Sequence, residues 1–188
     1  MKILAVILAA MGLLALSYSA FEFGRARRFQ ATEVRNFAEP RPPETASAKP
    51  EFTLDPPPVA GSPVAVLSIP RLEMSAVVVE GAENQELNIG PGHVRGTPMP
   101  GRGGNFAVAG HRDTFFRPLR QIRRDDTIIM KTRDREFHYR VVSTEIVKPS
   151  DIHVLYPKGH ETLTLVTCYP FDFVGAAPYR FIVHADGS

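Results

Sequence analysis

The side chains that could do covalent chemistry in this 188-residue chain include a single cysteine, Cys168. It follows the alternating run 162–167, and Pro170 comes two positions later. Alternation with β-branched residues predicts a strand, and a proline cannot donate to a sheet ladder, so we expect the strand to end at or just past the thiol. A thiol at the end of a rigid element suits a nucleophile, although a lone cysteine is more often a small buried hydrophobe.

A cysteine nucleophile needs a histidine or a positive field that favours its thiolate. His111 is the leading candidate, because it follows Ala109-Gly110 at the end of a predicted strand and opens a loop, where Gly110 would let the backbone turn. His93, in a glycine-rich turn, is only slightly less favoured. The remaining histidines lie in predicted strands or in a polar loop: His138, His153, His160 and His184.

A third group should stabilise an oxyanion or hold a substrate, and Arg180 is the candidate. It lies twelve positions after Cys168 in the last predicted strand, so the two residues could meet in neighbouring antiparallel strands. An arginine in mid-strand faces either a cleft or solvent, and the sequence leaves both open.

The elements that must position these residues begin at Pro63. We expect a short helix at 83–88, turns at 90–93 and 96–101, and a hairpin turn at 133–135. Seven strands are predicted: 64–69, 76–80, 105–109, 127–132, 136–147, 162–167 and 179–184. Seven or eight short strands with few helices predict an all-β barrel or sandwich, and a domain of this size can bury its own core.

The candidate residues lie in motifs that resemble those of the sortase family. Residues 164–168 (Thr-Leu-Val-Thr-Cys) match the TLxTC signature, and 109–114 are similar to the sortase histidine motif. Arg180 falls where the family keeps its arginine. The longer motifs 110–119 and 167–171 look most like those of class D sortases.

The resemblance covers about residues 63–188 and implies a closed sortase-type β-barrel of about eight strands. It also implies a cysteine transpeptidase that cleaves an LPxTG-like sorting signal of an exported protein. In such an enzyme Cys168 would form a thioester, His111 would protonate the leaving amine and Arg180 would stabilise the oxyanion. The acyl group would pass to an amine of peptidoglycan or of a pilin lysine.

The same resemblance implies that Thr167 and Tyr169, on either side of the cysteine, help to bind the substrate. It implies no cofactor and no metal for the chemistry. Asp125-Asp126 is expected to be a solvated turn, and we see no acidic cluster that argues for calcium.

Two other classes of function remain to be weighed. Another cysteine enzyme of the cell wall, or a papain-like enzyme, would also use a cysteine and a histidine, but the sequence around Cys168 fits neither motif. A non-catalytic binding barrel on a stalk would leave Cys168 buried and inert, and so resistant to alkylation.

The N-terminal segment 1–23 contains an uncharged run, 3–21, whose length is that of a membrane-spanning helix. It is longer than a typical signal-peptide core, which favours a single-pass anchor, although small residues at 17–19 leave cleavage open. Three arginines follow the span, and the positive-inside rule would keep them in the cytoplasm. We nevertheless expect the catalytic domain on the extracytoplasmic side of the cell membrane, because its motifs fit an exported enzyme.

Residues 24–62 are proline-rich and predict a stiff, extended linker between the anchor and the domain at 63–188. The formal net charge is +2, which gives no reason to expect a nucleic-acid partner.

Overall fold

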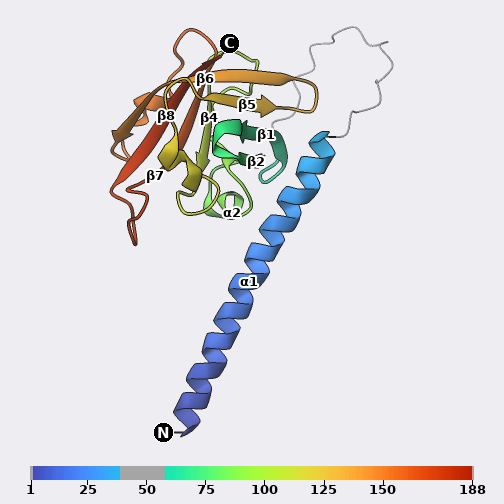
Figure 1. Cartoon of the computed structure of the whole chain (residues 1–188), viewed down its shortest axis with the longest axis vertical. Coiled ribbons are helices and arrows are strands. Elements are labelled where there is room, and N and C mark those ends of the chain that lie inside the picture. Colours follow the sequence, from blue (N-terminus) through green and yellow to red (C-terminus); the bar gives the residue numbers. More distant parts are fainter. Residues whose placement is uncertain (1, 39–57, 188) are drawn as a thin grey trace.

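A computed structural model describes residues 2–38 and 58–187, so most of the proline runs of the predicted linker lie outside the described residues. A long N-terminal helix, α1 (Lys2–Ala38), lies beside a β-barrel with its C-terminal half and projects away from the barrel with its N-terminal half (Figure 1). The chain thus has a rod and a barrel, and the candidate chemistry belongs to the barrel.

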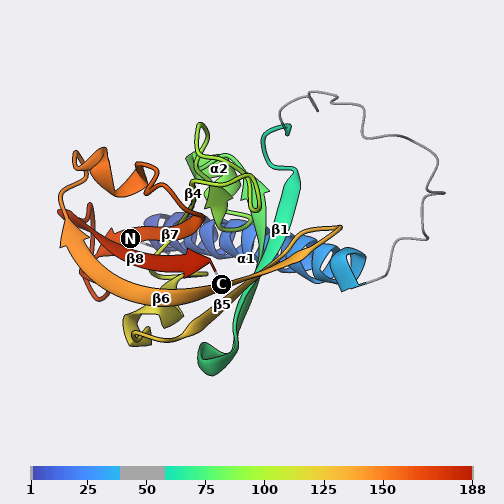
Figure 2. The ribbon, with the colours of Figure 1, turned by 90° about the horizontal axis from the view of Figure 1, so that it is seen from above.

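Eight strands form a closed barrel in the order β1-β2-β3-β4-β7-β8-β6-β5, with β1 and β5 paired at the closure (Figures 1 and 2). The strands are β1 (Pro63–Ile69), β2 (Met74–Glu80), β3 (Gly92–His93), β4 (Asn105–Gly110), β5 (Thr127–Lys131), β6 (Glu136–Val147), β7 (Thr162–Tyr169) and β8 (Tyr179–Gly187). Short helices lie between them: η1 (Pro70–Leu72), α2 (Asn84–Leu87), η2 (Arg117–Gln121) and η3 (Ile152–Leu155). The all-β barrel with short helices is confirmed.

The strand β3 was predicted as a turn, and this prediction is wrong. β3 pairs in parallel with β2 and antiparallel with β4, so it closes the barrel between them. A side chain at Gly92 is impossible, because the Gly81 carbonyl oxygen lies 2.0 Å from where its Cβ would be. A strand of two residues is too short to show the alternation of apolar and polar residues by which strands are predicted. The glycine that the close backbone approach requires is itself typical of a turn.

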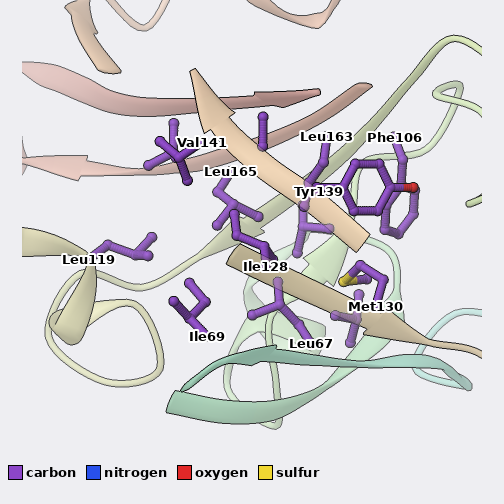
Figure 3. Packing of buried hydrophobic residues seen from close by; sticks show 14 of the residues in the cluster. Leu67, Ile69, Phe106, Leu119, Ile128, Met130, Tyr139, Val141, Leu163 and Leu165 are labelled. Atoms are coloured by element: carbon purple, nitrogen blue, oxygen red, sulfur yellow. The ribbon is translucent and has the colours of Figure 1, made fainter. Parts of the chain in front are cut away.

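The barrel interior is filled by side chains from alternate positions of the strands (Figure 3). On β7 these are Leu163 and Leu165, both fully buried, as the alternation predicts. Neighbouring strands contribute Leu67, Ile69, Phe106, Val108, Ile128, Met130, Tyr139, Val141 and Val183. Each such side chain contributes about 1.5–3 kcal/mol on burial, so this core holds the strand ends in fixed positions.

A second apolar cluster covers the outer face of the sheet. Val166 of β7 and Ile182 of β8 pack there with Val147 of β6. Val154 and Leu155 of η3, in the connection from β6 to β7, lie over them. This part of the sheet is therefore buried on both faces, which makes β7 a doubly covered strand.

Helix α1 has an exposed apolar half and a half that contacts the barrel. Its apolar half is long and hydrophobic enough to cross a membrane by length and composition. The helix continues to Ala38, so residues 24–38 are helical where the sequence was interpreted as an extended linker. The physical reason is that the first proline of the chain is Pro40, and nothing before it interrupts the helix.

The second half of α1 is attached to the barrel through Gln30. Its amide nitrogen donates to the carbonyl oxygens of Val77 (3.2 Å) and Ile89 (2.7 Å), and its amide oxygen accepts from the Val77 N–H (2.7 Å). Because β3 pairs with β2 only at Val79 and Glu80, the edge of β2 at Val77 has no strand beside it there. The Gln30 side chain takes the place of a strand at a residue that is fully buried.

Asp126 was expected in a solvated turn, and this prediction is wrong. Its carboxylate is buried, forms a two-pronged ion pair with Arg71 of η1 and accepts the Arg123 N–H at 2.8 Å. Arg71 also donates to the Gln121 carbonyl at 2.6 Å. The pair joins η1, η2 and the turn before β5, while Asp125 is the exposed residue of the two.

Candidate active site

The ends of three neighbouring strands bring the predicted site residues together. Cys168 of β7 lies directly opposite Arg180 of β8 in the antiparallel register. On the other side of β7, Gly110 of β4 is the parallel partner of Thr167. His111 is the next residue of the chain, so it leaves β4 at the level of Cys168. The strand order β4-β7-β8 therefore gives the row His111, Cys168, Arg180.

Cys168 and Arg180 share the outer face of the sheet. Side chains alternate along a strand, so both point to the side of Val166 and Ile182, the next pair along β7 and β8. Val147 of β6 faces Arg180 across the other edge of β8. Cys168, His111 and Arg180 are each half-buried. The row borders the apolar cluster under η3.

The guanidinium of Arg180 is held by its own neighbours in the chain. Its Nη1 donates to the carbonyl oxygens of Tyr179 (3.0 Å) and Ala177 (3.3 Å). In the described part of the chain no acceptor binds Nε or Nη2. The arginine is thus fixed through one nitrogen, and its half-buried side chain shares the outer face of the sheet with Cys168.

Thr167 lies on the opposite face of β7 from Cys168 and is buried. Its Oγ1 donates to the Gly110 carbonyl oxygen at 2.7 Å. Gly110 is packed against Phe116, whose ring atoms lie 2.6–2.9 Å from where a Cβ would be. The glycine is required by this close approach, and together these contacts fix the chain just before His111.

Tyr169 also points away from the Cys168 face. Its ring stacks on Phe181 with centroids 6.3 Å apart and meets the edge of Phe171 at 6.1 Å. Phe171 and Phe181 are themselves in edge contact at 5.3 Å. The three rings close the end of the barrel below the site, so Tyr169 supports the end of β7 from within.

His93, the alternative to His111, lies elsewhere. It is buried on β3, which is separated from β7 by β4. Its Nδ1 is 2.7 Å from Glu80 Oε2, and its Nε2 is 3.0 Å from Thr97 Oγ1. Its ring stacks on Phe106 with centroids 5.0 Å apart. Both ring nitrogens have partners, so His93 has a structural role and the row contains only His111.

A buried polar cluster, which the sequence did not indicate, anchors η3. The Asn105 amide nitrogen donates to the Val154 carbonyl at 3.1 Å, and Asn105 Oδ1 accepts from Thr164 Oγ1 at 2.8 Å. His184 follows on β8, with Nδ1 3.4 Å from Thr164 Oγ1 and Nε2 2.7 Å from Glu145 Oε1. His184, which was predicted to lie in a strand, is buried in this cluster. The three polar side chains come from β4, β7 and β8, and nothing in their separate sequence runs indicates that they meet.

Comparison with known proteins places this geometry in a family. A family model described as the sortase domain matches residues 67–188. Sortase D of Bacillus subtilis (strain 168) is 30% identical over 193 residues, which cover 97% of this chain and 96% of the relative. Sortase SrtE1 of Streptomyces coelicolor is 34% identical over 142 residues, covering 65% of this chain and 40% of the relative.

Solved structures agree with this assignment. A Clostridium perfringens sortase D5 transpeptidase matches with a TM-score of 0.63 and 30% identity, covering 69% of this chain and 81% of that one. Sortase E1 from Streptomyces coelicolor, with a tripeptide in the active site, matches with a TM-score of 0.63 and 32% identity, covering 68% and 89%. From its motifs, its barrel and these relatives, the chain belongs to the sortase family of cysteine transpeptidases and is most like class D.

Proposed function

We propose that this enzyme is a membrane-anchored sortase that cleaves an LPxTG-like sorting signal and transfers the acyl fragment to an amine. The observation that carries the proposal is the row at the ends of β4, β7 and β8. In it a thiol lies opposite a guanidinium in strand register, and the one histidine of the row follows the neighbouring strand end. A nucleophile, a proton donor and an oxyanion partner are the groups that acyl transfer needs.

The first step is attack of the Cys168 thiolate on the carbonyl carbon of the threonine in the sorting signal. A C–S bond forms and the carbonyl π electrons move to oxygen. The tetrahedral species then collapses, the C–N bond breaks, and His111 gives its proton to the departing amine. The products of this half-reaction are a thioester on Cys168 and a free C-terminal fragment.

In the second step an incoming amine attacks the thioester and Cys168 leaves as the thiolate. His111, now neutral, accepts the proton that the amine loses. Water attacking instead of the amine gives hydrolysis as a side reaction. We take the amine to be that of peptidoglycan or of a pilin lysine, and the acyl donors to be exported proteins.

Arg180 is assigned to the oxyanion and to the substrate backbone. Its fixed charge and planar fork allow one nitrogen to hold the chain at Ala177 and Tyr179 while another donates to the substrate. The apolar cluster beside the row, with Val166 and Ile182, excludes water from one side and strengthens that interaction.

The apolar half of α1 is proposed as the single-pass anchor, with the barrel on the extracytoplasmic side of the cell membrane. The family chemistry acts on exported proteins, which supports this orientation over the one that the arginines after the span would favour. Protease treatment of intact cells that leaves the barrel shielded in the cytoplasm would contradict it.

The function is tested with the full chain in detergent micelles and a library of LPxTG-type peptides, including Thr–Ala variants. We expect an adduct on the intact protein whose mass equals the acyl fragment in thioester linkage, and its loss in Cys168→Ala. Native Cys168 should also react with iodoacetamide, as a non-catalytic buried thiol would not. A Cys168→Ala protein that still turns the peptide over would refute the proposal.

A further inference from the structure

Arg112, the residue after His111, contacts the connection between β7 and β8. Its Nη2 donates to the carbonyl oxygen of Phe173 at 2.6 Å and to that of Gly175 at 3.0 Å. The guanidinium carbon lies 5.8 Å from the centroid of the Phe173 ring. One side chain therefore binds two backbone groups and one ring of the same loop.

That loop, residues 170–178, is named here the β7–β8 connector. It begins two residues after Cys168 and ends two residues before Arg180, so it forms a border of the candidate site. Its middle, from Asp172 to Ala176, is exposed, and Val174 is 95% exposed. A segment with so little buried surface has few contacts of its own to hold one conformation.

Within the connector the Phe173 N–H donates a long bond to the Pro170 carbonyl at 3.4 Å, and its contacts with other elements are at its ends or at the surface. Phe171 packs on the aromatic rings at the end of the barrel, and Arg180 binds the Ala177 carbonyl. Asp172 forms a pair with Arg120 at 3.5 Å, in which both side chains are exposed, and such pairs contribute little. The middle of the connector is thus held by Arg112.

The Arg112 side chain is half-buried, and its two bonds to the connector carry the charge of the guanidinium. Its Nη1 is buried and, in the described ranges 2–38 and 58–187, has no hydrogen-bond partner. Water is therefore excluded from that side of the guanidinium. The bonds from Nη2 to the connector lie at the surface, and because they are charge-assisted they are about twice as strong as neutral hydrogen bonds.

We propose that Arg112 is a positioning residue for the reaction. It joins the segment that carries His111 to the connector between Cys168 and Arg180, and so holds the connector as a preformed wall for the acyl-donor peptide. The inference rests on the proposed function. Its consequence is that Arg112 sets how well the peptide binds, because a loose connector must be ordered each time a peptide is bound.

Lysine cannot replace Arg112 in this role. An ammonium has three N–H donors and can bind a carbonyl, but it has no planar group that contacts the Phe173 ring while one of its nitrogens binds the two carbonyls. Arg112→Lys keeps the charge and removes this geometry, and Arg112→Gln removes both. Arg120→Gln is the matched control, since Arg120 contacts the same connector through an exposed ion pair.

The experiment measures kcat and KM of the full chain with an LPxTG-type peptide, together with hydrogen exchange of the connector and the melting temperature. We expect KM to rise roughly tenfold in Arg112→Gln and somewhat less in Arg112→Lys, with kcat changed by no more than about threefold. Connector amides should exchange faster in both Arg112 variants, while Arg120→Gln should match the wild type.

An unchanged KM, or a KM that rises equally in Arg120→Gln, would overturn the inference, as would unchanged exchange of the connector. A fall in melting temperature with kcat and KM intact would show a purely structural role and would also overturn it. The proposed function fails differently, since it predicts a thioester on wild-type Cys168. If no thioester forms on the wild-type protein, both proposals are wrong. If only the role of Arg112 is wrong, the thioester still forms.

Discussion

Thr167 binds the last residue of the neighbouring strand, with 2.7 Å between its Oγ1 and the Gly110 carbonyl oxygen. The residues that follow these two partners, Cys168 and His111, are the proposed nucleophile and proton donor. The bond therefore fixes the distance between the two β-strand ends that deliver them. A hydroxyl on the inner face of the sheet controls geometry on the outer face.

Replacing this hydroxyl should cost more activity than stability. Thr167→Val keeps the shape of the side chain and leaves the Gly110 carbonyl without its donor, which costs roughly 1 kcal/mol of unfolding free energy. We expect kcat to fall roughly tenfold, because the misplacement of a reacting group is amplified in the rate. Kinetics and thermal melts on the same samples give both numbers. Thr144→Val, at an exposed position of β6, should behave as the wild type.

Arg180→Lys should lose roughly a hundredfold in kcat while the barrel remains folded. The three N–H donors of an ammonium lie on one nitrogen, so lysine loses the fork in which Nη1 binds the Ala177 and Tyr179 carbonyls and a separate nitrogen donates to the oxyanion. Turnover of an LPxTG-type peptide and the circular dichroism spectrum are the measurements. Arg124→Lys, at an exposed position, serves as control. Rates near those of the wild type would remove Arg180 from the mechanism.

Acid should weaken the barrel through the Arg71–Asp126 pair. The hydrogen bond from the Arg71 guanidinium, aided by the Arg123 N–H, holds the pKa of the Asp126 carboxyl below its usual 3.8 despite burial. Since the folded pKa is the lower one, the stabilisation is complete above about pH 4 and is lost as the pH falls through that folded value.

Asp126→Asn should therefore lower the melting temperature by several degrees at pH 7 and flatten its dependence on pH below about 4. Thermal melts over a pH series make the measurement. The neighbouring Asp125→Asn is the control, because Asp125 is exposed and its backbone φ of 69° suits asparagine. Equal acid sensitivity in wild type and Asp126→Asn would contradict the assignment.

Gln30→Glu should release α1 from the barrel. The carboxylate has no N–H for the Val77 and Ile89 carbonyls and would lie against both oxygens. We expect the Val77 amide, which donates to Gln30, to lose protection from hydrogen exchange, at a cost of about 1–3 kcal/mol in local opening. Asn36→Asp, the same chemical change at an exposed position of α1, should leave that amide protected. Equal protection of the Val77 amide in both variants would show that the Gln30 contact does not stabilise the attachment of α1.

The strands and their pairing could largely be predicted, because the alternation of side chains along each strand is visible in the sequence. The alternation that ends at Cys168 and the short return to Arg180 indicated that the two could meet in neighbouring antiparallel strands, and in the β7–β8 register they are paired. The hairpin at 133–135 was predicted in the same way, and the Thr132 N–H does bond the Arg135 carbonyl at 2.8 Å.

The parts that could not be predicted depend on contacts between residues that are far apart in the chain. Arg112 and Gln30 each bind carbonyl oxygens of distant residues, and any residue type offers a carbonyl. Asp126 likewise needed the position of Arg71, which precedes it by 55 residues and is on another element. Sequence patterns report which face a side chain is on, and they do not report which remote backbone it reaches.

Because α1 is one continuous helix, it fixes the orientation of the barrel relative to the apolar half of the helix. A helix transmits rotation as well as length, at about 100° and 1.5 Å for each residue. One continuous helix joins the exposed apolar half of α1 to Gln30, which binds β2. The number of residues between them therefore sets the rotation of the barrel about the helix axis. Inserting one alanine between them would rotate the barrel, and the face that carries Cys168, by about 100° relative to the apolar half, while the contacts of Gln30 with the barrel stay the same. A flexible hinge at that place would allow the barrel to keep its original orientation.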